Sequence, residues 1–187
     1  MNLTHAQLVA LASDWLWRRG CQVVITELTT SCGEIPDAIG WHTNGYATTS
    51  MLIECKTSRA DYRADRQKIA RLLPDRRMGR ECLYLAPAGV LTADEVRAQG
   101  WGLLEAVPAT RERWSVHGWS VRHTVGAIEG EANHAQETAF LISALRRVPG
   151  SIRGVRCRVY TLDSASEPRA TLGVLAEDAT DASEGAS

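Results

Sequence analysis

Hydrophobic and polar positions follow two periods along this chain, and the changes of period mark the expected elements. The first helical pattern is preceded by Thr4, which can cap a helix, and followed by Gly20, which can end one. A second helical pattern begins after Ser58 and ends at Pro74. The expected helices cover residues 4–19, 58–73 and 131–147, with a short helical turn at 92–99; the expected strands cover residues 21–28, 34–41, 50–56, 81–86 and 101–107.

Several connections carry signals of their own. Pro36 lacks an amide hydrogen, so the strand at 34–41 is expected at a sheet edge or with a bulge at that position. Asn44-Gly45 predicts a hairpin turn before the strand at 50–56. The region after residue 107 is compatible with a second hairpin that turns at His117-Gly118, and alternation favours one more strand at 155–159. The pattern as a whole predicts an α/β domain, a mixed sheet with helices around it.

The net charge of −1 hides an uneven distribution. Six of the 22 acids and one of the 21 bases lie from Asp163 onward, which leaves 20 bases and 16 acids in the preceding part. Residues 56–80 alone hold nine bases and three acids. Such a local concentration of positive charge favours a polyanionic partner more than the whole-chain balance does.

The five cysteines are odd in number and show no zinc-site spacing, and the sequence contains no signal peptide or membrane-length apolar run. We therefore expect free thiols in a reducing cytoplasm.

Two apolar segments each contain one acid, Asp37 in Ile-Pro-Asp-Ala-Ile and Glu54 in Ile-Glu-Cys-Lys. A lone carboxylate in an apolar strand is costly, which points to a function. Glu54 and Lys56 are two apart and share one face of a strand, and in a hairpin Asp37 can lie beside Glu54. A divalent cation would relieve the repulsion between the two carboxylates, and hard oxygen ligands suit Mg²⁺ or Mn²⁺.

Such a cation could acidify an attacking water and offset charge on a phosphoryl transition state. Lys56 could orient that water or neutralise the phosphate. The carbonyl of Cys55 could add a metal ligand while its side chain points to the opposite, core face. Glu27 and Glu34 are either auxiliary ligands or structural acids.

A basic group follows the motif strand. It comprises Arg59, Arg63, Arg66 and Lys68 on the expected helix, with Arg76 and Arg77 beyond it and Arg80 extending it. Next to a phosphate-cleaving site these side chains could bind a nucleic-acid backbone. Alternatively, Asp61 and Asp65 pair with them on a solvated helix face.

Pro36-Asp37 followed by Glu54-x-Lys56 resembles the PD-(D/E)XK nuclease superfamily, and residues 54–68 look like the longer motif of MmcB-type DNA-repair endonucleases and related phage and bacterial proteins. The resemblance implies a restriction-endonuclease-like core over residues 1–107, a bound Mg²⁺ or Mn²⁺, and hydrolysis of DNA in repair, recombination or phage DNA processing. Residues 108–176 would be an extension packed on the same domain, and residues 177–187 a disordered acidic tail. Many members of this superfamily cut both strands as dimers, so the resemblance leaves open whether this chain forms a homodimer.

Two other functions fit the same residues. A module that keeps the fold without catalysis would bind DNA in a salt-sensitive way and cut nothing. An RNA or nucleotide phosphodiesterase would use the same chemistry on another substrate.

Overall fold

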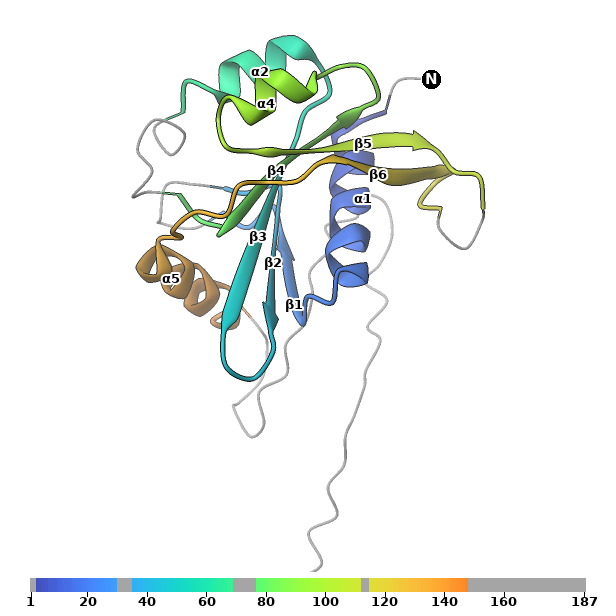
Figure 1. The fold of residues 1–187 in the computed structure, drawn as a ribbon. Helices are drawn as coiled ribbons and strands as arrows, with labels where there is room; N and C mark the ends of the chain where they lie inside the picture. The colour runs from blue at the N-terminus through green and yellow to red at the C-terminus, as the bar shows by residue number, and fades with distance from the viewer. Residues whose placement is uncertain (1–2, 30–34, 69–76, 112–114, 148–187) are drawn as a thin grey trace, which may run out of the picture.

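The computed structural model describes residues 3–29, 35–68, 77–111 and 115–147, which form a six-stranded open sheet with helices on both faces (Figure 1). The strands are β1 (Val23–Thr26), β2 (Ala38–Thr43), β3 (Thr48–Cys55), β4 (Glu81–Pro87), β5 (Gly102–Pro108) and β6 (Trp119–Val125). The helices are α1 (His5–Arg18), α2 (Arg59–Asp65), α4 (Ala93–Arg97) and α5 (His134–Leu145). The predicted mixed α/β architecture is confirmed.

The strands lie in the sheet in the order in which they follow one another in the chain. Antiparallel pairs join β1 to β2, β2 to β3 and β5 to β6, whereas β3–β4 and β4–β5 are parallel. The two parallel steps require crossovers, and these contain α2 and α4. The carboxyl end of β3 therefore leads directly into α2.

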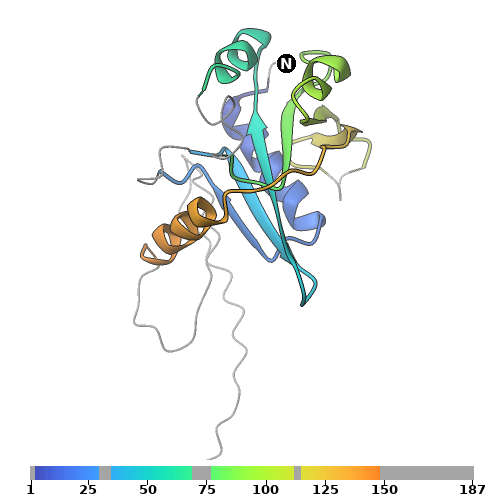
Figure 2. The same cartoon turned by 60° about the vertical axis from the view of Figure 1, so that its left-hand side comes forward.

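Each face of the sheet has its own apolar core. Helix α1 packs on one face through Leu8, Leu11 and Leu16. Helices α2, α4 and α5 pack on the other through Tyr62, Val96 and Phe140, with α5 at the opposite end of that face from α2 and α4 (Figure 1, Figure 2). Because helices cover both faces of the sheet, successive side chains of β3 and β4 are buried on either face, and their sequences are continuously apolar rather than alternating.

Helix α5 brings a buried carboxylate to the sheet. Glu137 Oε1 accepts hydrogen bonds from Ser50 Oγ at 2.6 Å and from the amide of Gly79 at 2.8 Å. Ser50 Oγ in turn accepts from the amide of Arg80 at 3.0 Å. This contact joins α5 to β3 and to the segment before β4, and it satisfies polar groups that burial would otherwise leave costly.

Local signals in the sequence account for most element boundaries. Thr4 and Gln7 form the capping box that begins α1. Ser58 caps α2 by accepting from the amide of Asp61. The Asn44-Gly45 turn joins β2 to β3 as predicted, with Gly45 at φ 90°. The turn at His117-Gly118 is also present, with φ of 51° and 84°, but the main partner of β6 is β5.

The prediction for Pro36 was wrong. Strand β2 begins at Ala38, after the proline, and it lies between β1 and β3 in regular register rather than at an edge or with a bulge. Because Pro36 stands outside the ladder, its missing amide hydrogen costs no strand pairing, and its carbonyl accepts from the amide of Glu27 at 3.2 Å. The helix predicted over residues 58–73 is shorter in the structure: α2 ends at Asp65, with Arg66 as its C-cap, and residues 69–73 lie outside the described residues. The expected strand at 155–159 and the acidic tail also lie outside the described residues.

None of the helices in the described part of the chain is long and apolar enough to span a bilayer.

Substitution of Gly40 by alanine should destabilise the fold, because α1 crosses β2 closely there. An added methyl group would lie 2.8 Å from Sγ of Cys21 and 3.3 Å from a methyl carbon of Leu16. We expect a loss of about 1–3 kcal/mol in the free energy of unfolding, measured by denaturant titration. Gly126→Ala is the control, since nothing lies within 4 Å of its added methyl group. Equal midpoints for the two variants would contradict the close packing.

Candidate active site

Asp37 lies immediately before β2 and next to the end of β3. The register pairs Ala38 with Ile53, and Oδ2 of Asp37 accepts a 2.6 Å hydrogen bond from the amide of Cys55. The predicted hairpin therefore brings Asp37 against the Glu54-Cys55-Lys56 segment. The Asp37 side chain is 16% exposed, so one side of it faces solvent.

Cys55 separates the two charged residues of the motif and points the other way. Its side chain is buried in the core beneath α1, as alternation predicted. Burial raises the pKa of the thiol well above its usual value, and the nearby carboxylate of Asp37 adds to this effect. The thiol is therefore protonated at neutral pH and unsuited to act as a nucleophile.

Glu54 and Lys56 form a buried ion pair on the opposite face. Their side chains are 1% and 4% exposed, and Lys56 Nζ lies 3.0 Å from Glu54 Oε2. Burial alone would lower the pKa of Lys56, but the carboxylates of Glu54, Asp65 and Asp37 outweigh it and raise that pKa. Lys56 is therefore a cation at neutral pH, which suits a group that donates hydrogen bonds rather than one that removes a proton.

The alternative that Asp65 pairs with the basic residues on a solvated helix face is right about the pairing with Lys68 and wrong about the exposure. The Asp65 side chain is 1% exposed, and Oδ1 lies 3.1 Å from Lys56 Nζ and 2.8 Å from Lys68 Nζ. Oδ2 accepts a hydrogen bond from the hydroxyl of Tyr84 at 3.0 Å. A signal was present in the sequence: Asp65 is three residues after Tyr62, so both share the buried side of α2.

A second polar cluster adjoins Asp37 on its exposed side. His5, in the first turn of α1, places Nε2 3.4 Å from both Asp37 Oδ1 and Glu27 Oε1. Glu27 adopts a φ of 49°, uncommon for a residue with a side chain. The predicted helper Glu27 thus lies near Asp37, and no pattern in the sequence pointed to His5. Glu34 lies outside the described residues.

The pKa of His5 is raised above its ordinary value of 6.5. The hydrogen bond to Asp37 is the largest cause; partial burial works against it, and the charges of Asp37 and Glu27 add to it.

The expected basic group is divided in space. Arg63, Arg66 and Lys68 are exposed on or just after α2, and Lys68 reaches the site, with Nζ 3.8 Å from Glu54 Oε2. Arg59, also on α2, is ion-paired with Glu95 of α4. The α2 basic group, meaning these four residues, therefore adjoins the carboxyl end of β3.

Arg77 and Arg80 lie elsewhere, and Arg76 lies outside the described residues. Arg80 is paired with Glu129 at 2.8 Å, and the Arg77 carbonyl accepts from the amide of Asn133. The register pairs Met51 with Glu81 and Cys55 with Leu85, so this end of β4 lies about 13 Å along the sheet from the site.

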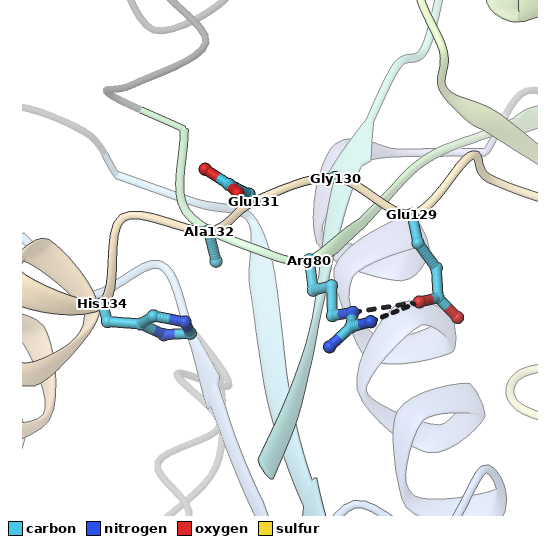
Figure 3. A pocket seen from close by; sticks show the side chains of 6 residues that line it. All are labelled: Arg80, Glu129, Gly130, Glu131, Ala132 and His134. Carbon is cyan, nitrogen blue, oxygen red and sulfur yellow. Dashed lines mark hydrogen bonds and ion pairs between the residues drawn. The ribbon is translucent and has the colours of Figure 1, made fainter. Parts of the chain in front are cut away.

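A pocket of about 560 Å³ opens beside Arg80 (Figure 3). Its lining consists of Arg80, Glu129, Gly130, Glu131, Ala132 and His134. Figure 3 shows the guanidinium of Arg80 turned toward Glu129, whose carboxylate offsets its charge. With two acids in the lining, this pocket does not extend the α2 basic group.

Among the described residues, no three His, Cys, Asp or Glu side chains are arranged as ligands for one metal ion. At the motif, the Asp37 carboxylate contacts the backbone of Cys55, and the Glu54 carboxylate contacts Lys56. No family model, no curated protein and no solved structure matches the chain.

The histidine next to Asp37 should titrate above pH 6.5 in buffer that contains a chelator. Because protonation is favoured in the folded state, His5 adds stability that is fully present below pH 6.5 and is lost as pH rises through its folded-state pKa. His5→Gln should therefore lower the melting temperature more at pH 5.5 than at pH 8.5. Proton NMR of the imidazole reports the pKa directly, and Asp37→Asn should lower it. A wild-type value at or below 6.5 would contradict the contact.

Proposed function

We propose that this chain is a divalent-metal-dependent nuclease of the PD-(D/E)XK type that hydrolyses phosphodiester bonds in DNA. One observation carries the proposal: Asp37 is bound to the amide of Cys55, the residue that separates Glu54 from Lys56. This bond places the Asp37 carboxylate against the backbone of the segment that carries Glu54 and Lys56, and this position supports the proposal.

The order of elements supports the same proposal. A helix, three antiparallel strands, a helix and a parallel strand follow one another in α1, β1–β2–β3, α2 and β4, with Asp37 just before β2 and Glu54 near the end of β3. This order is compatible with a restriction-endonuclease-like core. The carboxyl end of β3 leads into α2, so a phosphate backbone bound there would meet the α2 basic group.

The donor set fits Mg²⁺ or Mn²⁺ in its chemistry. Asp37 and Glu54 would hold the cation with the backbone oxygen of Cys55, because Mg²⁺ is commonly bound through one or two carboxylates and keeps several waters. When bound, it supplies Lewis acidity and a more acidic water. The raised pKa of Lys56 keeps this side chain charged, so it donates to a phosphate oxygen or to the attacking water and does not act as the base.

A second candidate function is a DNA-binding module without catalysis. The observation that favours it is the Glu54–Lys56 pair, which is almost fully buried and already supplies each charge with a partner. A cation would have to compete with Lys56 for Glu54. Calorimetry with Mn²⁺ separates the two functions: the nuclease binds the cation and loses this binding in Glu54→Gln, whereas the module binds none.

Cleavage should depend on the three motif residues. With Mg²⁺ or Mn²⁺, the purified protein should nick or cut at least one member of a panel of supercoiled, linear, single-stranded and branched DNA. Asp37→Asn should abolish cleavage, and Lys56→Ala should reduce its rate on the order of 100-fold or more. The control is Asp94→Asn, an exposed acid on α4, which should retain the wild-type rate. Cleavage that survives both motif substitutions would place the activity elsewhere.

DNA binding should depend on the α2 basic group and not on the far end of β4. Without the metal, Arg63→Ala should weaken binding to duplexes of any sequence and reduce the slope of log K against log salt by about one. Arg80→Ala is the matched control, because Arg80 is paired with Glu129 and lies apart from α2. Fluorescence anisotropy at several salt concentrations measures both. Equal losses in the two variants would refute this location of the surface.

A further inference from the structure

We propose that Asp65 is the positioning residue for Lys56: it holds the ammonium group beside Glu54 and remains its partner when Glu54 binds a cation. The catalytic part of this inference rests on the proposed nuclease function, whereas the structural part does not.

Both carboxylate oxygens of Asp65 contact a buried polar group. Oδ1 lies 3.1 Å from Lys56 Nζ, and Oδ2 accepts a 3.0 Å hydrogen bond from the hydroxyl of Tyr84. Hydrogen bonds to a charged group are among the stronger ones in proteins and are directional. The carboxylate therefore has a defined orientation, and it offers Lys56 a fixed acceptor from the helix side.

Tyr84 is itself held by the core. It is fully buried, lies opposite Glu54 in the β3–β4 ladder, stacks on Trp101 with 4.4 Å between ring centroids and meets Tyr62 edge-on at 5.0 Å. Because Trp101 and Tyr62 hold the ring of Tyr84 from two sides, the position of its hydroxyl is defined as well. The position of Asp65 is thus set by strand β4 as well as by α2, which carries it.

Glu54 and Asp65 both contact Lys56, but their positions suit different roles. Lys56 Nζ lies 3.0 Å from Glu54 and 3.1 Å from Asp65, so either carboxylate could hold it. Glu54 is in the motif with Asp37, and a cation bound there would draw on its charge. Asp65 is farther along, at the end of α2, and would then be the acid that keeps Lys56 in place. Lys68, 53% exposed, balances Asp65 from the solvent side at 2.8 Å.

Loss of the Asp65 charge should release Lys56 once Glu54 is no longer its partner. The ammonium protons of surface lysines exchange rapidly with water, whereas a buried, ion-paired ammonium group can give a ¹H–¹⁵N cross-peak. In protein without DNA or metal, we expect such a peak for Lys56, assigned by its absence in Lys56→Ala. In Glu54→Gln, where Asp65 is the acid left beside Lys56, the peak should persist; it should disappear when Asp65→Asn is added to that background and remain when the control Asp94→Asn is added instead. Absence of the peak in the wild type, or its persistence in the Glu54→Gln/Asp65→Asn double variant, would overturn the proposal.

The kinetic arm tests whether Asp65 acts through Lys56. Asp65→Asn should lower kcat for DNA cleavage roughly 10- to 100-fold, with KM within about twofold of wild type. In the Lys56→Ala background the same change should have little further effect. Equal fold losses in both backgrounds would show that Asp65 has only a structural role.

Tyr84→Phe provides an independent variant if Asp65→Asn does not fold. It keeps the carboxylate and removes one of its hydrogen bonds, so the Lys56 peak should weaken and kcat should fall by roughly threefold to tenfold. No change in either measurement would overturn the proposal. If the wild type cleaves no DNA, the proposed function fails, while the cross-peak still decides whether Asp65 holds Lys56.

Discussion

The hydrogen bond from the amide of Cys55 to Asp37 determines where the other motif residues can lie. On the other side of the same segment, the amide of Lys56 donates to the carbonyl of Leu85 in β4 at 2.8 Å. The end of β3 is thereby held between the start of β2 and the interior of the sheet. With the backbone fixed from both sides, alternation sends Cys55 beneath α1 and sends Glu54 and Lys56 to the opposite face.

That face contains two buried carboxylates, Glu54 and Asp65, and two ammonium groups, Lys56 and Lys68. Burial of a charge costs several kcal/mol per ion, so such a group persists only when its members neutralise one another. The group is consequently poor as a source of stability. It is better understood as an arrangement that specifies position, since removing one member leaves another charge uncompensated.

The periods of the sequence were enough to predict the order of elements, and the turn at Asn44-Gly45 was enough to place Asp37 near Glu54. The rest depended on tertiary packing. Asp65 lies in a helix rich in charges, where pairing on the surface is the usual outcome, and only its spacing from Tyr62 indicates burial. His5 reaches Asp37 because α1 packs across the sheet, and no local pattern in the sequence encodes that packing.

Glu137 has a consequence for how the protein is made. The Glu137 carboxylate accepts hydrogen bonds from Ser50 and from the amide of Gly79, and it follows them in the chain by 87 and 58 residues. During synthesis neither hydrogen bond can form before α5 has been made. Until the ribosome has released α5, the nascent sheet exposes part of an apolar face and leaves these polar groups to water. Early assembly must therefore rely on α1 and the β2–β3 hairpin, which are complete first, and the final closure is a late, long-range event.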